Sequence, residues 1–429
     1  LGLIRRELLR LKPEVVGFSV RNIDNNDIQA PAFFIRDFFP RLIRTVRSLT
    51  QVPIVLGGAA VPVMPEELLR YTEATCAVLG DGETVFPLLL ERLSEGGTVD
   101  SIPGVAWIEE GVYRANRFLP HRSECSCRPP DFHHWINIRA YLSRLSTIPV
   151  QTKLGCQFSC VYCTYRKIEG SRYRLSSPDE VLDTVSVLAS RDLRSIEFVD
   201  NVFNSPYDHG FAVCERLASA RLRASFQCLE LNPLHLDDAF ISVMERGGFT
   251  GIGITVESAS DSVLHGLGKG FTADHVHRAA GIIGRHDLPC IWMFMMGGPN
   301  ETKKTVRETL SFAERYIRPR DVAFFGMGIR VYPGTEIDAI ARRQGLLSLS
   351  PSEMLEPVFY LSPELDFGWL HHQVKTAMAG HVNFISSDFL GQPILKPLHR
   401  IGYHLGLTSP LWRYTSVLRR GLRTLGMEV

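Results

Sequence analysis

The chain has 429 residues, of which 45% are hydrophobic and 22% are charged, and its formal net charge at pH 7 is +1. This length is enough for two or three domains with buried cores, and the composition is ordinary for a soluble globular protein. A charge so close to zero gives no electrostatic footprint for nucleic acid, so no nucleic-acid partner is expected.

The apolar runs, the start of the chain and the cysteine count bear on the cellular compartment of the protein. No apolar run reaches the ~18 residues that span a bilayer, and the start shows no signal-peptide pattern. The chain begins with Leu1 inside a predicted helix, so we expect that its true amino terminus is missing. Nine cysteines, odd in number and mostly in apolar segments, favour a reducing cytoplasm over a disulfide framework. Cys125 and Cys127 form a C-x-C motif, for which plain linker residues are favoured over a second metal site.

Apolar strands and helices alternate over residues 1–100. Continuous apolar strands of this kind predict a parallel, doubly wound, Rossmann-like sheet. Such sheets bind ligands at the carboxyl ends of their strands. The predicted strands are 15–20, 53–56 and 76–79, and the predicted helices are 3–11, 33–49, 65–71 and 84–93.

Small or polar residues follow each of these three strands. Glycines let a bulky ligand approach the backbone, and the following helix start offers N–H donors. Plain turn glycines are the alternative explanation. The candidate ligand-binding residues are Ser19, Arg21, Asn22, Gly57, Gly58, Gly80, Gly82 and Glu83.

The periodicity is lost over residues 101–147, which we interpret as a linker. Residues 105–108 and 112–114 predict a hairpin, and 125–131 are rich in proline and arginine. His133 and His134 could bind a metal, but adjacent side chains rarely point together, so surface or packing roles are favoured.

Strand and helix alternate again from residue 148. A closed eight-stranded barrel typically needs ~250 residues, so six shorter units predict a barrel that is open on one side. Active-site residues in parallel barrels gather at the carboxyl ends of the strands. The predicted strands are 148–152, 195–199, 224–229, 251–256, 289–296 and 322–331, with helices at 178–189, 207–220, 237–246, 272–285 and 301–316.

Three cysteines spaced C-x3-C-x2-C follow the first of these strands: Cys156, Cys160 and Cys163. Thiolates are soft ligands that suit zinc or an iron–sulfur cluster better than magnesium or calcium. A structural zinc site usually needs four ligands, and the next cysteine is Cys214. Three thiolates on a four-iron cluster would leave one iron open. We therefore favour an iron–sulfur cluster over zinc and over unliganded core cysteines.

The carboxyl ends of the other barrel strands carry further candidate residues. These would lie at the mouth of the barrel, the same end as the cysteine loop. Glu257 could instead be a carboxylate at a helix start, stabilised by the helix dipole, and Arg330 could merely pair with a neighbouring acid. The candidates are Asp200, Asn201, Glu257, Ser258, Gly297, Gly298, Pro299 and Arg330, the last just before Y-P-G-T at 332–335.

These motifs resemble those of a known family. The cysteine loop, with Tyr162 before the third cysteine, resembles the signature of radical S-adenosylmethionine (SAM) enzymes. V-E-S-A-S-D at 256–261 is similar to the family's E-S-G-S turn, and G-G-P-N-E-T at 297–302 resembles its G-x-P-G-E-T turn, which packs on the SAM adenine. The sequences V-G-x-S-x-R-N, G-G and G-D-G-E, in this order, resemble the cobalamin-binding domain that precedes the barrel in one subfamily.

The resemblance implies three cofactors. A 4Fe-4S cluster would be held by the three cysteines, and its open iron would bind SAM. Cobalamin would be bound by the strand-end residues of the amino-terminal domain, but no D-x-H-x-x-G is present, so the lower cobalt ligand stays open. Asp200-Asn201 departs from the two aspartates of many relatives, which leaves the ligand of the SAM amino group open. The implied SAM-binding residues are Tyr162, Asp200, Asn201, Glu257, Ser258, Gly297, Gly298, Pro299 and Arg330.

The fold class implied by pattern and resemblance is α/β. We expect a Rossmann-like cobalamin-binding domain at 1–100, lacking its first strand, then a linker at 101–147, a partial (β/α)6 barrel at 148–345 and a helical region at 346–429. A basic amphipathic tail over residues 390–429 could lie on a membrane or an acidic partner, but a helical cap over the open barrel is favoured. The basic residues of this tail are Lys396, Arg400, Arg413, Arg419, Arg420 and Arg423, against the single acid Glu428.

The function implied by the resemblance is methylation of an unactivated carbon in a small biosynthetic intermediate. The reduced cluster would cleave SAM to a deoxyadenosyl radical that takes hydrogen from the substrate, and methylcobalamin would deliver the methyl group. An electron donor such as flavodoxin or ferredoxin would be the protein partner. Cyclisation or rearrangement on the same scaffold and a non-enzymatic cobalamin sensor are the alternatives. Methylthiotransfer is disfavoured because the resemblance would then imply three further cluster cysteines in the amino-terminal domain. That domain has only Cys76.

Overall fold

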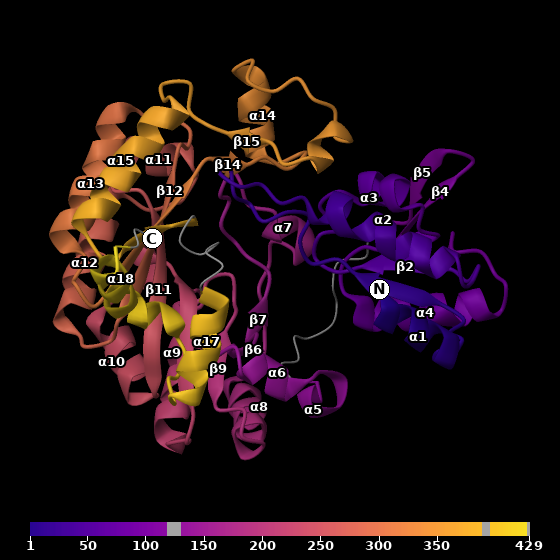
Figure 1. Cartoon of the computed structure of the whole chain (residues 1–429), viewed down its shortest axis with the longest axis horizontal. Coiled ribbons are helices and arrows are strands. Elements are labelled where there is room, and N and C mark those ends of the chain that lie inside the picture. The colour runs from indigo at the N-terminus through magenta and orange to yellow at the C-terminus, as the bar shows by residue number, and fades with distance from the viewer. Residues whose placement is uncertain (118–129, 388–394, 427–429) are drawn as a thin grey trace. The chain divides into compact units, whose positions relative to one another are not determined.

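The computed structural model describes residues 1–117, 130–387 and 395–426 (Figure 1). Cys125, Cys127 and Glu428 lie outside these ranges, as does the side chain of Lys396. Within them, no helix is both long and apolar enough to cross a membrane. The chain forms two compact units, one of residues 1–123, 161–171 and 330–360 and one of the remainder. Each unit is an α/β structure, as the sequence predicts.

The first unit is built on a five-stranded sheet with the order β1-β2-β3-β4-β5. The first three strands are parallel, which confirms the Rossmann-like prediction. The hairpin β4–β5 pairs antiparallel with β3 and extends this sheet, whereas the sequence places it in a linker. It joins the sheet because Ile102 and Val105 are buried with Val55 and Cys76. The elements are α1 Gly2–Leu11, β1 Val16–Ser19, α2 Phe34–Arg47, β2 Ile54–Gly57, α3 Pro65–Thr72, β3 Cys76–Val78, α4 Gly82–Ser94, β4 Val105–Glu109 and β5 Val112–Ala115.

Two later segments of the chain belong to this first unit. They include α7 Tyr165–Ile168, α14 Glu336–Arg343, the 3-10 turn Glu353–Leu355 and β15 Phe359–Tyr360, which pairs with β14 Ile329–Arg330. Lys167 joins these segments by donating to the carbonyl of Pro333 at 2.7 Å. Thr335 caps α14 by accepting from the N–H of Asp338.

The second unit contains a seven-stranded parallel sheet, in which the six predicted strands lie side by side in chain order. The predicted open barrel is therefore confirmed, and a seventh strand, β16, is added beyond β13. The strands are β6 Ile148–Val150, β9 Ser195–Phe198, β10 Ser225–Leu231, β11 Phe249–Glu257, β12 Cys290–Met296, β13 Val322–Met327 and β16 Phe384–Ser386, with the short pair β7 Lys153–Leu154 and β8 Arg174–Leu175 beside them. The helices are α5 Phe132–Trp135, α6 Ile138–Leu142, α8 Pro178–Ser190, α9 Tyr207–Ala220, α10 Asp238–Arg246, α11 Asp261–Gly266, α12 Ala273–Arg285, α13 Lys303–Tyr316, α15 Phe367–Gly380, α17 Leu395–His404 and α18 Thr415–Thr424, with 3-10 turns at Pro233–His235 and Leu411–Tyr414.

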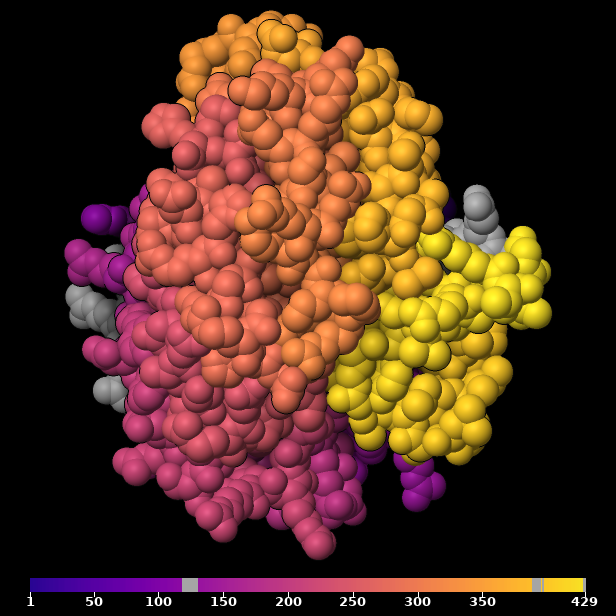
Figure 2. Space-filling model, turned by 90° about the vertical axis from the view of Figure 1, so that its left-hand side faces the viewer, coloured from indigo at the N-terminus to yellow at the C-terminus, as the bar shows by residue number. Residues whose placement is uncertain are grey.

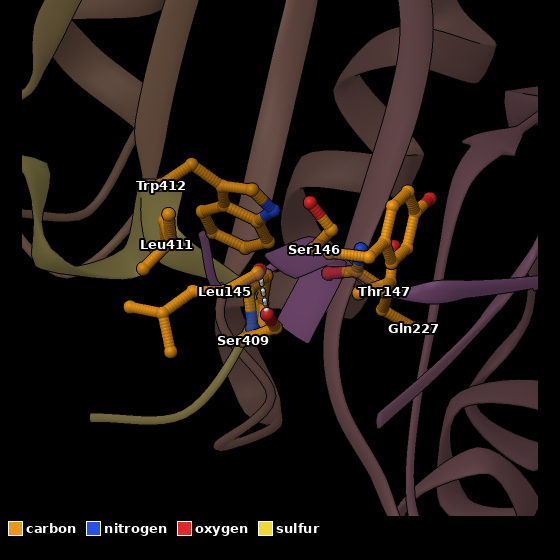
Figure 3. Close-up of a pocket in the computed structure, with 9 residues that line it drawn as sticks. Leu145, Ser146, Thr147, Gln227, Ser409, Leu411 and Trp412 are labelled. Atoms are coloured by element: carbon orange, nitrogen blue, oxygen red, sulfur yellow. Dashed lines mark hydrogen bonds between the residues drawn. The ribbon is translucent and has the colours of Figure 1, made fainter. Parts of the chain in front are cut away.

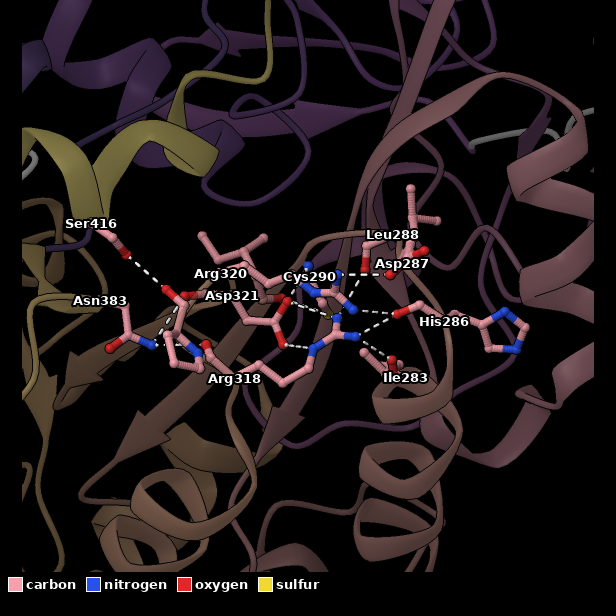
Figure 4. Close-up of polar contacts among 12 residues, drawn as sticks. Ile283, His286, Asp287, Leu288, Cys290, Arg318, Arg320, Asp321, Asn383 and Ser416 are labelled. Atoms are coloured by element: carbon pink, nitrogen blue, oxygen red, sulfur yellow. Dashed lines mark hydrogen bonds and ion pairs between the residues drawn. The ribbon is translucent and has the colours of Figure 1, made fainter.

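A polar network fixes the amino-terminal ends of β12, β13 and β16 (Figure 4). Arg318 donates to both oxygens of Asp321, and Asp321 accepts from the backbone N–H of Cys290 at the start of β12. Asn383, just before β16, donates to the carbonyls of Arg318 and Asp321. These bonds hold the short seventh strand in the sheet, although it comes from the region predicted to be helical.

The carboxyl-terminal helices pack on this unit (Figure 2). Arg419 is 3% exposed and donates to the carbonyls of His381, Val382 and Phe384, while Arg423 donates to that of Met378. Two of the basic residues therefore tie the segment to α15 and β16. Membrane contact through the remaining cations stays a prediction.

The turn between α17 and α18 lies near the beginnings of the strands. Gly251 of β11 makes room for it, because an added Cβ would lie 2.8 Å from both Pro410 and Trp412. A shallow pocket of about 330 Å³ remains there, lined by Thr147, Gln227 and Trp412 among others (Figure 3). In parallel barrels the amino-terminal face serves stability, whereas the chemistry takes place at the opposite face.

Candidate active site

The cysteine loop follows β7 through Gly155, whose φ of 88° suits glycine. Cys156 is 6% exposed, Cys160 and Cys163 are partly exposed, and none of the three forms a disulfide with another described cysteine. Within the described ranges, no three or more His, Cys, Asp or Glu side chains are grouped closely enough to hold a metal ion. The three sulfur atoms are therefore not gathered into a metal site in this structure. The loop is a candidate cluster site because of the spacing and the exposure of its cysteines.

The remaining described cysteines differ from these three in burial. Cys76, Cys214, Cys228 and Cys290 are all 0% exposed. Burial raises the pKa of the Cys76 thiol to about 12 and raises those of the other three as well. A thiol must lose its proton to bind a metal, so these four are core residues. The chemistry of the loop cysteines, three soft donors on one turn, fits an iron–sulfur cluster.

A buried ion pair holds the chain just before the cysteine loop. Lys153 is 1% exposed and Asp200, after β9, is 0% exposed. The Nζ of Lys153 lies 2.9 Å from Oδ2 of Asp200 and 3.0 Å from the carbonyl oxygen of Phe203. Asp200 also accepts from the backbone N–H of Thr152 at 2.7 Å and from its hydroxyl at 2.6 Å. Since hydrogen bonds and a charge satisfy both carboxylate oxygens, the pair is compatible with its burial.

This geometry changes the interpretation of Asp200. The sequence assigns it to SAM, but its carboxylate is enclosed and positions the entry to the cysteine loop. Its neighbour Asn201 is partly buried and remains a candidate. Asn204 fixes the rest of this turn by donating to the carbonyls of Asn232 and His235.

Glu257 ends β11 in an unusual backbone conformation. Its φ is 62°, a left-handed value that costs energy for a residue with a side chain and is often found at functional sites. Its carboxylate lies 3.1 Å from Nζ of Lys269, and both residues are 5% exposed. The alternative role at a helix start is not supported, because α11 begins at Asp261, four residues later. The hydroxyl of Ser258 is 3.0 Å from that of Thr309.

The turn after β12 is held by one carboxyl group. Oε2 of Glu301 accepts from the backbone N–H groups of Gly297 and Gly298. Gly297 has a φ of 100°, and an added Cβ would lie 2.6 Å from Leu361. Glu301 is 0% exposed, and this burial raises its pKa to about 7. The turn is thus a rigid, glycine-lined surface at the carboxyl end of a strand.

Glu301 predicts a pH dependence of stability. Its pKa of about 7 lies above the value of 4.5 that it has without burial. The folded state therefore holds its proton more tightly, and stability present below about pH 4.5 is lost as the pH rises through 7, by about 3 kcal/mol at most. Glu301→Gln keeps an acceptor oxygen and removes the charge, so this loss should disappear. Urea unfolding at pH 5 and pH 8 measures it, with the exposed Glu314→Gln as control; equal losses in Glu301→Gln and wild type would contradict the assignment.

The strand ends of the first unit are largely open to solvent. Gly58 is a required turn residue, because its φ is 94° and an added Cβ would lie 2.6 Å from the carbonyl oxygen of Val20. An added Cβ at Gly57 or Gly82 would meet nothing within 4 Å, so a ligand can approach the backbone there. Ser19, Arg21, Asn22, Gly58 and Glu83 are exposed, and Gly57, Gly80 and Gly82 are partly exposed.

Arg330 has an acid partner in the first unit. Its Nε lies 2.7 Å from Oδ2 of Asp24, and the side chains of both residues are at most 3% exposed. The guanidinium also donates to the carbonyls of Val331 and Met354. The alternative that Arg330 pairs with a neighbouring acid is therefore what the structure shows, and its contact with SAM stays a prediction.

Comparison with known proteins decides the class of the barrel. Residues 150–313 match the Radical SAM superfamily. They form a radical SAM domain. The chain is 27% identical over 351 residues to an uncharacterized methyltransferase of Pyrococcus horikoshii, covering 80% of this chain and 72% of the relative. It is 21% identical to tryptophan 2-C-methyltransferase of Streptomyces laurentii, covering 75% of this chain and 63% of the relative.

The fold of the whole chain also has a solved counterpart. The radical SAM methyltransferase TsrM of Kitasatospora setae, with cobalamin and a [4Fe-4S] cluster bound, matches with a TM-score of 0.83 at 20% identity. The match covers 96% of this chain and 88% of TsrM, so it includes the Rossmann-like sheet as well as the radical SAM domain. The match to the Radical SAM superfamily and the two methyltransferase relatives together show that the chain is an enzyme.

Sequence reasoning missed the charged partners inside the radical SAM domain. Lys153, Lys269 and Glu230 were not singled out: Lys153 and Glu230 lie at or near strand ends, and Lys269 lies between α11 and α12. For Lys153 the sequence did carry a signal, because it directly follows an apolar strand, in K-L-G-C. A lysine that is buried at such a position needs a charged or hydrogen-bonding partner.

Proposed function

We propose that this enzyme is a cobalamin-dependent radical SAM methyltransferase acting on an unactivated carbon of a small biosynthetic intermediate. The observation that carries the proposal is a loop of three cysteines outside any disulfide among the described residues, on a parallel barrel. The same chain carries a Rossmann-like sheet with open, glycine-lined strand ends. The names of the relatives support methyl transfer. In this proposal residues 1–100, extended by the hairpin β4–β5, bind cobalamin, and the parallel barrel sheet within residues 148–345 carries the catalysis.

The proposed roles follow from the positions of the residues. Cys156, Cys160 and Cys163 would hold the cluster, while the Lys153–Asp200 pair fixes the start of their loop. When bound, the cluster with SAM supplies a strong hydrogen-atom abstractor, and cobalamin supplies a methyl carrier. An electron donor such as flavodoxin or ferredoxin would supply the reducing electrons. SAM would contact Tyr162, Asn201, Glu257, Ser258, Gly297, Gly298 and Pro299.

Cobalamin would lie against the strand ends of the first unit. Gly57 and Gly82 leave space for a large flat ligand, and the start of α4 offers backbone N–H groups. Gly58 would act indirectly, by letting the turn pack on Val20. The exposed side chains of Ser19, Arg21, Asn22 and Glu83 would supply polar contacts.

Anaerobic purification followed by reconstitution with iron, sulfide and hydroxocobalamin tests this proposal. We expect about four irons per chain and a retained corrin absorption band. Cys156→Ala should lose the iron, because it removes one of three ligands. Cys214→Ala is the matched control, since that cysteine is buried in the core and should leave the iron content unchanged.

Other results would contradict parts of the proposal. Zinc in place of iron would overturn the radical chemistry. Iron without a corrin band would keep SAM cleavage and remove the methyl carrier. Full biological output from Cys163→Ala would favour a cobalamin sensor, and a product with the mass of a cyclised or rearranged substrate would replace methyl transfer with that reaction.

A further inference from the structure

β10 carries one extra residue close to its carboxyl end. Cys228 pairs with Ile252 and Leu231 pairs with Ile254, so three steps along β10 match two along β11. Ile252 and Ile254 share one face of the sheet because strand side chains alternate. Cys228 and Leu231 must share that face as well, which turns both residues between them, Leu229 and Glu230, toward the opposite face. This is a β-bulge, a device that re-aims side chains and is enriched next to active sites.

Residues on both sides of β10 accommodate this bulge. On the neighbouring strand, an added Cβ at Gly253 would lie 2.5 Å from the carbonyl oxygen of Leu229 and 2.7 Å from its Cα. Only glycine leaves room for the bulged backbone. On the other side, the N–H of Phe203 donates to the carbonyl of Glu230 at 2.8 Å. The direction of the Glu230 side chain is therefore fixed by its neighbours on both sides.

The Glu230 carboxyl lacks the partner that its acidic neighbours have. Glu257 is paired with Lys269, and Glu197 accepts from Thr147 and Gln227. Among the described residues, no side chain donates to the Glu230 carboxyl or forms an ion pair with it, and the residue is partly exposed. A ligand that entered the barrel beside Glu230 would therefore meet a carboxyl with no competing side-chain partner among the described residues.

The electrostatics of this position favour a cation. Burial raises the pKa of Glu230 to about 8, the charges of Glu257 and Glu197 raise it further, and Lys269 lowers it. Two other carboxyl groups and one ammonium group thus act on the Glu230 carboxyl. A positively charged ligand would supply the missing partner and favour the ionised carboxylate.

We propose that Glu230 binds an ammonium group of the acceptor substrate, which makes the substrate of this enzyme an amine. The inference rests on the proposed methyl transfer and adds the class of the acceptor. SAM carries an ammonium group of the same chemistry, so the test has to distinguish the two sources.

The test compares benzylammonium with benzyl alcohol, two probes of similar shape that differ in charge. Their binding to the reconstituted protein is followed by the broadening of their aromatic proton resonances. We expect benzylammonium to bind and benzyl alcohol to bind at least about tenfold more weakly. Glu230→Gln should weaken benzylammonium by a similar factor and leave the dissociation constant of SAM unchanged. Glu308→Gln on the surface of α13 is the matched control.

Each contrary result overturns the proposal. Equal benzylammonium binding by Glu230→Gln and wild type would remove Glu230 from the site, and weaker SAM binding would assign the carboxyl to SAM. If the variant does not fold, wild-type binding of benzylammonium must strengthen as the pH rises through about 8, and a flat profile refutes the role. These measurements need no turnover, so they fail independently of the proposed reaction, which the iron and corrin contents test.

Discussion

Replacing Lys153 by methionine is expected to lower the local stability of the barrel by about 3–5 kcal/mol. Methionine fills a similar volume but leaves the carboxylate of Asp200 buried without its counter-ion. The two hydrogen bonds from Thr152 remain, yet they cannot replace a charge at 2.9 Å in a site that is 0–1% exposed. Hydrogen–deuterium exchange of peptides that cover residues 148–203 measures the loss where it occurs.

Two further variants separate this effect from simple loss of a lysine. Lys304→Met removes a lysine whose side chain is 86% exposed and should change stability by less than about 0.5 kcal/mol. The double variant Lys153→Met/Asp200→Asn removes both charges and keeps an oxygen for the N–H of Thr152, so it should recover a large part of the loss. If the double variant is as unstable as the single one, the ion pair is not the cause.

The same variant reports on the cysteine loop. Lys153 is three residues before Cys156, and its ammonium group ties the chain to the turn after β9. A loosened loop should hold less reconstituted iron, even though all three cysteines are present. Full iron content in a destabilised Lys153→Met protein would show that the loop assembles without this anchor.

The fold was largely predictable because its signals are local. The six predicted barrel strands are short apolar runs that alternate with five predicted helices, and this alternation alone indicates parallel pairing. β16 was missed because it is three residues long and is placed by remote contacts, those of Asn383 with Arg318 and Asp321. The hairpin was recognised, but its attachment to β3 depends on a core shared with Ile102, which no local pattern shows.

The candidate site divides in the same way. The cysteines stand out because their spacing is itself the signal, whereas the position of Asp200 in the sequence does not show what its carboxylate contacts. Its partners Thr152 and Lys153 adjoin the cysteine motif in sequence, but only the fold brings them to the carboxylate. The direction of the Glu230 side chain depends on a one-residue bulge. Such a bulge is visible only in the register of β10 against β11, which neither strand sequence shows by itself.

Loss of Asp24 is expected to be the most damaging change in the first unit. Arg330 is 5% exposed, and Asp24→Leu would leave its guanidinium with carbonyl partners only, so stability should fall by about 3–5 kcal/mol. Arg330→Met should cost a similar amount by leaving the carboxylate alone. Arg36→Met is the control from the same unit, because its side chain is 51% exposed and its surface pairs should contribute little to stability.

Variants of Asp24 and Arg330 can also show whether the ion pair affects cobalamin binding, which the corrin absorption band measures. Asp24 follows the candidate cobalamin residues Arg21 and Asn22, and it also accepts from the N–H of Asn26 at 2.9 Å, so it shapes the loop that carries them. Asp24→Asn keeps that turn and removes the charge, which should destabilise the pair and weaken cobalamin binding together. Asp24→Asn/Arg330→Met should restore stability in large part. If cobalamin binding recovers with it, the ion pair acts by fixing the loop; if binding stays weak while stability returns, the charge of Arg330 or Asp24 acts on the ligand directly.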